Sequence, residues 1–181
     1  MTKLAIALAV LAMPASASAS VIAVGGGYAG SCYEAAEAQN IAAESLDVCN
    51  RALEEEALFA SDRVATHVNR GIIYLRRGAV GQAEADFDQA LSLDEGQAEA
   101  WLNKAILHAR YRNSRDAMPF VSKALANGTR RPAVAYFVRA MAYEDSGDIR
   151  AAYRDLQKAR SLAPKWGEPV AELARFQVRR P

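Results

Sequence analysis

The sequence predicts an all-α protein, a right-handed α-solenoid of stacked helical hairpins closed by a C-terminal capping helix. One frame of small and large residues occurs three times, at spacings of 34 and then 35 residues. A period near 34 residues is typical of stacked helical hairpins. Apolar residues recur within each copy at the spacing of a helix face, and Gly78 and Gly147 mark turns inside two of the hairpins.

The repeated frame consists of six positions in each copy. The copies are Gly71, Tyr74, Gly78, Ala83, Phe87 and Ala90; then Ala105, His108, Arg112, Ala117, Val121 and Ala124; then Ala140, Tyr143, Gly147, Ala152, Leu156 and Ala159. The small residues let two antiparallel helices approach closely, and the larger ones fill the interior between them. We therefore expect Ala83, Ala117 and Ala152 to be helix–helix contacts. Pro119 lies inside the second helix of the middle copy and should loosen its first turns.

These residues resemble the tetratricopeptide repeat family, whose pattern is W-x2-L-G-x2-Y followed by a small residue, an aromatic, an alanine and a proline. Trp101 occupies the first aromatic position of the second copy, and Pro164 closes the third. His67 replaces the tryptophan of the first copy, and Glu95 and Thr129 replace the closing proline in the first two. The resemblance covers about residues 64–166 and implies an α-solenoid that binds a protein partner.

In a stack of this family, one face of the first helix of each repeat lines a concave groove. Here that face is mostly apolar, with two asparagines and two arginines at equivalent positions. The predicted protein-binding groove consists of Val68, Asn69, Ile72, Arg76, Leu102, Asn103, Ile106, Arg110, Phe137 and Met141. The lysines with which some members clamp a C-terminal carboxylate are absent. The apolar side chains would anchor a partner segment, the asparagines would hold its backbone, and the arginines would meet acidic side chains.

The groove has an alternative interpretation, in which the chain fills it itself. The apolar arm Val21–Val24, or packing between neighbouring repeats, could bury the same face. The corresponding function would be that of a self-associating structural protein.

The N-terminus has the features of a secretory signal peptide. Lys3 precedes the apolar run Leu4–Met13, and Pro14 is followed by alternating Ala and Ser. The run is too short to span a bilayer. We expect cleavage after Ala19, with Ala17 as the alternative site. An uncleaved anchor or a buried helix is the competing interpretation.

Cys32 and Cys49 are the only cysteines, and we predict that they form one disulfide. Two helices folding back around Asn40 and Ile41 would place residues 32 and 49 side by side. Residues facing each other across the clear hairpins are 16 apart, and the two cysteines are 17 apart. A redox-active thiol is the alternative, but the sequence lacks a Cys-x-x-Cys motif.

Evidence for catalysis or cofactor binding is weak. Gly25–Gly30 matches G-x-G-x-x-G, yet the sequence after it is helical throughout, so a dinucleotide fold is not expected. His67 and His108 occupy packing positions of the repeat rather than a metal or acid–base site. The run Glu54–Glu56 is interpreted as solvated charge. We predict no enzyme activity, no cofactor and no metal.

The predicted organisation is a signal peptide at 1–19, an apolar and Gly-rich arm at 20–30, and a degenerate, disulfide-stapled hairpin at 31–63. Three repeats follow at 64–97, 98–132 and 133–166, and a capping helix with its tail at 167–181. Without Lys3 the chain has equal numbers of basic and acidic residues, so nucleic acid is not an expected partner. The predicted role is a non-catalytic scaffold, periplasmic or secreted, that holds a segment of an envelope protein. No membrane insertion is expected after signal removal, and a homo-oligomer is possible.

Overall fold

The structure is a computed structural model that describes residues 20–21 and 27–176. The predicted signal peptide, residues 22–26 of the arm and residues 177–181 lie outside the described residues. The described part of the chain is helical and contains no strand. Its elements are α1 (Tyr28–Glu37), α2 (Ala43–Glu55), α3 (Ala60–Arg76), α4 (Val80–Leu93), α5 (Ala98–Tyr111), the 3-10 turn η2 (Ser114–Ala117), α6 (Met118–Ala126), α7 (Pro132–Asp145), α8 (Ile149–Leu162) and α9 (Gly167–Arg175).

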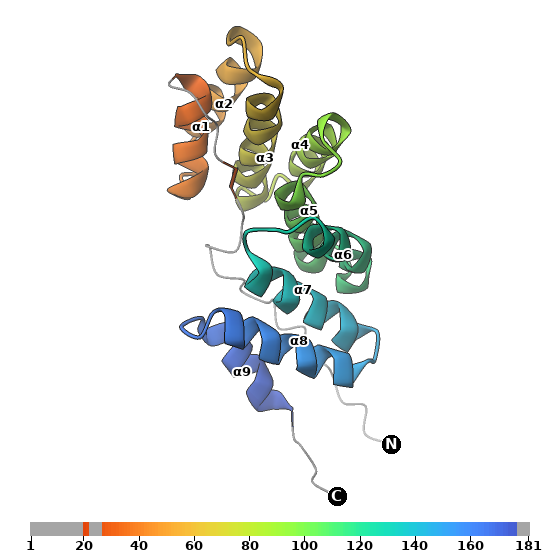
Figure 1. The fold of residues 1–181 in the computed structure, drawn as a ribbon. Coiled ribbons are helices and arrows are strands. Elements are labelled where there is room, and N and C mark those ends of the chain that lie inside the picture. Colours follow the sequence, from red (N-terminus) through yellow and green to blue (C-terminus); the bar gives the residue numbers. More distant parts are fainter. Residues whose placement is uncertain (1–19, 22–26, 177–181) are drawn as a thin grey trace, which may run out of the picture.

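Consecutive helices pair into hairpins that stack along the chain (Figure 1). α1 packs on α2, α3 on α4, α5 on η2 and α6, and α7 on α8. Neighbouring hairpins contact each other through α2 and α3, α4 and α5, and α6 and α7. The predicted α-solenoid is therefore confirmed.

The repeated frame forms the interior of the hairpins. Ala83, Ala117 and Ala152 are each completely buried, as expected for close contacts between the paired helices. At Gly71 an added Cβ would lie only 2.6 Å from the Phe87 ring, so the helices α3 and α4 approach too closely for a larger residue. The small residues of the frame thus set the distance between paired helices.

Enlarging Ala83 to leucine should overpack the α3–α4 interface and lower the free energy of unfolding by about 1–3 kcal/mol. Ala152→Leu should have the same effect between α7 and α8. Ala85→Leu is the matched control, because Ala85 lies on the exposed face of α4. Thermal unfolding followed by circular dichroism measures the change. Equal melting temperatures for the Ala83 and Ala85 variants would contradict the close packing.

The first hairpin begins earlier than the arm boundary suggested. α1 starts at Tyr28, so residues 28–30 are helical rather than part of the arm. The cause is Glu56, whose carboxylate accepts hydrogen bonds from the backbone N–H groups of Tyr28 (2.6 Å) and Ala29 (3.1 Å). Glu56 therefore caps α1 from the end of α2, and the interpretation of the whole Glu54–Glu56 run as solvated charge was wrong.

The predicted disulfide between Cys32 and Cys49 is present and joins α1 to α2. Both cysteines are completely buried and pack against Ile73 of α3. Arg63 of α3 adds a hydrogen bond to this interface, because it donates to the carbonyl of Leu53 in α2 at 3.1 Å. The stapled hairpin is therefore docked on the first repeat rather than flanking it loosely.

The middle hairpin differs from the other two where Pro119 lies. The expected single helix is divided into the 3-10 turn η2 and the short helix α6, with Pro119 in the first turn of α6. A proline lacks the N–H that a helix interior requires, so it is tolerated only at such a start.

The last helix, α9, packs on α8 and closes the stack (Figure 1). Trp166, just before α9, contacts Phe137 of α7 with ring centroids 5.0 Å apart. Phe176, just after α9, contacts Tyr153 of α8 at 5.7 Å. This arrangement covers the apolar face that the last repeat would otherwise expose. Within the described residues, no helix is both long and apolar enough to cross a membrane.

Candidate functional site

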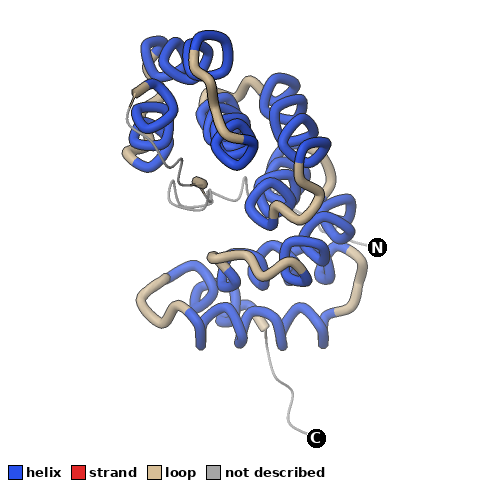
Figure 2. The backbone as a smooth tube through the Cα atoms, turned by 45° about the horizontal axis from the view of Figure 1, so that its top comes forward, coloured by secondary structure: helices blue, strands red, loops and turns tan. Residues whose placement is uncertain are grey.

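The predicted groove residues lie on α3, α5 and α7, the first helices of the three repeats. These helices follow the inner side of an arc, where the short described segment at residues 20–21 also lies (Figure 2). Val21 belongs to the main hydrophobic core, together with Val68 and Ile72 of α3. The structure thus brings the start of the described chain onto the predicted groove.

Asn69 pairs with the backbone of Val21 through both functional groups of its amide. Its Oδ1 accepts a hydrogen bond from the Val21 N–H at 2.8 Å, and its Nδ2 donates to the Val21 carbonyl at 2.6 Å. Such a pairing recognises an extended main chain without reading its side chain. The predicted task of Asn69, holding a backbone in the groove, is performed here on the chain's own residue.

The apolar groove residues are buried rather than open to solvent. This holds for all six of them, which are Val68, Ile72, Leu102, Ile106, Phe137 and Met141. Contacts between α3 and α5 and between α5 and α7 contribute to this burial, as does Val21 at the first repeat. The alternative of a self-filled groove therefore has direct support, and the prediction that these residues anchor a partner stays a prediction.

The polar groove residues differ in their surroundings. Asn103 is completely buried, and its Nδ2 donates to the Glu99 carbonyl one turn earlier in α5. Arg76 donates to the carbonyl of Ala36 in α1 at 2.5 Å. Burial, and secondarily the positive charge of Arg131, lowers the pKa of Arg76. Arg110 is exposed, with its guanidinium 5.3 Å from the centre of the Tyr111 ring. Of the two arginines, Arg110 is thus the more accessible to a partner.

A second set of polar residues, which was not predicted from the sequence, links the two helices of the first and third repeats. Arg139 of α7 donates two hydrogen bonds to Asp155 of α8, at 2.7 and 3.0 Å. These bonds raise the pKa of Arg139. Arg70 and Asp86 form the equivalent pair in the first repeat. The signal was available, because these positions follow the same spacing of 34 and 35 residues as the frame.

The middle repeat replaces that ion pair with an aromatic contact. Phe120 stands where the other repeats have aspartate, and the Lys104 ammonium lies 5.0 Å from the centre of its ring. His108 also packs on Phe120, at 4.6 Å between ring centres. This confirms His108 as a packing residue.

His67 lies at a hairpin interface as well. Its Nδ1 is 2.9 Å from the Asp86 carboxylate that also binds Arg70. Among the described residues, no group of three or more histidine, cysteine, aspartate or glutamate side chains is placed to hold a metal ion.

Comparison with known proteins agrees with this geometry. Residues 133–165 match the family model of the tetratricopeptide repeat. No curated protein matches the sequence. Two solved structures share the fold with a TM-score of 0.64, each covering 81% of this chain and 79% of its own. They are residues 41 to the end of MamA from Desulfovibrio magneticus RS-1, at 19% identity, and a MamA RS-1 double mutant, at 18%. Residues 133–165 therefore match a tetratricopeptide repeat, and the described part of the chain shares the helical fold of these two structures.

Proposed function

We propose that this chain is a non-catalytic scaffold of the bacterial envelope that holds an extended segment of a partner protein along α3, α5 and α7. The repeats and the fold support a protein-interaction scaffold. The observation that carries the finer proposal is the pairing of Asn69 with both backbone groups of Val21. A side chain that recognises main chain in this way can accept different sequences, provided that an apolar residue takes the place of Val21 in the core.

The proposed mechanism is exchange of one extended segment for another. Residues 20–21 occupy the Asn69 position in the isolated chain, and a partner segment would take their place. The partner would reproduce the two hydrogen bonds, so displacement would leave no buried amide unsatisfied. Apolar side chains of the partner would then replace the contact that Val21 makes with the core.

The envelope location rests on sequence features and on the disulfide. The apolar run and the small residues before Ser20 favour export, and a stable disulfide is typical of an oxidising compartment. Removal of residues 1–19 would leave Ser20 as the first residue, directly before Val21, whose backbone Asn69 holds. The arm would then be a free chain end, which is easier to displace than an internal segment.

The test is selection of peptides from a random display library on the folded protein. We expect the unmodified chain to enrich a set of peptides and Asn69→Ala to lose them, because the amide that holds the backbone is gone. Asn127→Ala is the matched control, since Asn127 is exposed at the end of α6. Circular dichroism verifies that each variant is folded. Enrichment of the same peptides by Asn69→Ala would refute the proposed backbone recognition.

The second candidate is a self-associating structural protein, and the same Val21–Asn69 pairing favours it. If residues 20–21 of one copy occupy Asn69 of another, the chain forms oligomers through its groove. Sizing of the purified protein with and without envelope extract separates the two functions. The apparent size of a scaffold increases only when extract is added. A self-associating protein is already an oligomer without extract, and Asn69→Ala should dissociate it.

A further inference from the structure

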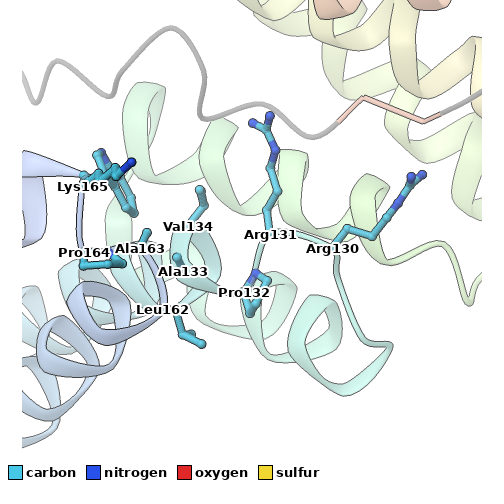
Figure 3. Close-up of a pocket in the computed structure, with 10 residues that line it drawn as sticks. Arg130, Arg131, Pro132, Ala133, Val134, Leu162, Ala163, Pro164 and Lys165 are labelled. Atoms are coloured by element: carbon cyan, nitrogen blue, oxygen red, sulfur yellow. The ribbon is translucent and has the colours of Figure 1, made fainter.

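A cavity of about 890 Å³ lies where the start of α7 meets the connection between α8 and α9 (Figure 3). This is within the size range of ligand-binding clefts in proteins. Two separate stretches of the chain form its walls. The lining residues are Arg130, Arg131, Pro132, Ala133, Val134, Leu162, Ala163, Pro164, Lys165 and Trp166.

The charge of this cleft is entirely positive among its described lining residues. Arg130, Arg131 and Lys165 contribute three cations, and no lining residue is acidic. Arg130 and Lys165 are exposed, and neither has an ion pair within the described part of the chain. The charge of Arg131 also reaches Arg76 of α3, where it adds to the effect of burial in lowering the pKa of Arg76.

The other walls of the cleft are apolar, and one of them carries an unused hydrogen-bond donor. Trp166 is held against Phe137 with ring centroids 5.0 Å apart. Its indole Nε1 is buried and has no acceptor among the described residues. Leu162, although apolar, is exposed at the rim.

We propose that this cleft binds an acidic linear segment of a partner protein, with one carboxylate on Arg130, a second on Lys165 at the opposite end of the cleft (Figure 3), and an apolar side chain over Trp166. The proposal rests on the proposed function and specifies the chemistry of the partner. Seven of the ten lining residues are apolar, which suits a peptide better than a small inorganic anion. The side chains of Arg130 and Arg131 also extend toward the side on which residues 20–21 pass (Figure 3).

The experiment continues the library selection with the complete chain and with the form beginning at Ser20, which retains every described residue. We expect the enriched peptides to contain Asp or Glu next to a large apolar residue. One such peptide is labelled with fluorescein, and a copy carries Asn or Gln in place of its acids. Fluorescence anisotropy then measures both affinities at low and at high salt.

The variant Arg130→Gln with Lys165→Gln should bind the acidic peptide about tenfold more weakly at low salt, and less so at high salt. The copy without acids should bind this variant and the unmodified chain equally. The matched control is Arg154→Gln with Lys158→Gln, which removes the same charge from the exposed face of α8. All four positions are exposed, so these variants should keep the melting temperature of the unmodified chain.

The outcomes separate this inference from the function on which it rests. Enriched peptides without an excess of acids, or equal affinities for the cleft variant and its control, would overturn the cleft assignment and leave the Asn69 proposal intact. A failure of the unmodified chain to enrich any peptide would overturn both. Binding to phosphatidylglycerol vesicles that only the cleft variant loses, with peptide affinity unchanged, would assign the cleft to a lipid surface instead.

Discussion

Ile106→Glu is expected to lower the free energy of unfolding by more than about 4 kcal/mol. Ile106 is only 2% exposed and belongs to the main core. A glutamate there would bury a carboxylate within the main hydrophobic core. The melting temperature should fall by on the order of 10 °C or more. Thermal unfolding by circular dichroism measures the loss.

The matched control is Ile149→Glu, which makes the same chemical change at a residue that is 50% exposed. Ile149 begins α8, where a negative charge is favourable, so this variant should retain its melting temperature. If Ile106→Glu were as stable as the control, Ile106 would lie in an open groove. The self-filled interpretation would then be wrong, and Ile106 would become a candidate anchor for the partner.

Loss of the disulfide is expected to cost about 3 kcal/mol, since the bridge closes a loop of 17 residues. The double variant Cys32→Ala with Cys49→Ala should therefore melt at a lower temperature than the oxidised chain. A reductant should lower the melting temperature of the unmodified chain and leave the double variant unchanged. The variant thus serves as the control for unrelated effects of the reductant.

Mass spectrometry after alkylation in denaturant, without reductant, checks the bridge in protein recovered from its native compartment. The expected mass shows no alkylated cysteine and a chain that begins at Ser20 or Ser18. Two alkylated cysteines would rule out the bridge in the cell. A mass that includes residues 1–19 would contradict the proposed export with cleavage.

The stacked hairpins were predictable because their signal is local and repeated. Each hairpin brings together residues 16 or so positions apart, and small residues at those positions recur in every copy. Gly71 shows the reason for the small residues. Phe87 of α4 packs against it, so no side chain fits at the point where α3 and α4 touch. The disulfide followed from the same geometry. The Arg139–Asp155 pair obeyed the same spacing and could have been found with it.

Whether the groove residues are buried or exposed was not predictable, because their burial depends on how one repeat packs against the next. Within a single repeat, an apolar residue that faces a partner and one that faces a neighbouring helix look the same. Ile106 illustrates this, since its position in the first helix of the second repeat allowed both interpretations. The packing of α5 against α3 and α7 decided that it is buried.

By itself, the sequence determined the helical class, the hairpin stack and the bridge between Cys32 and Cys49. Only the tertiary structure decided that Asn69 holds Val21, a residue 48 positions away, and that residues 130–134 and 162–166 enclose one basic cleft. The physical reason is the range of the interactions. Helix pairing is encoded in short, repeated spacings, whereas contacts between distant segments depend on the curvature of the whole stack, which no single repeat encodes.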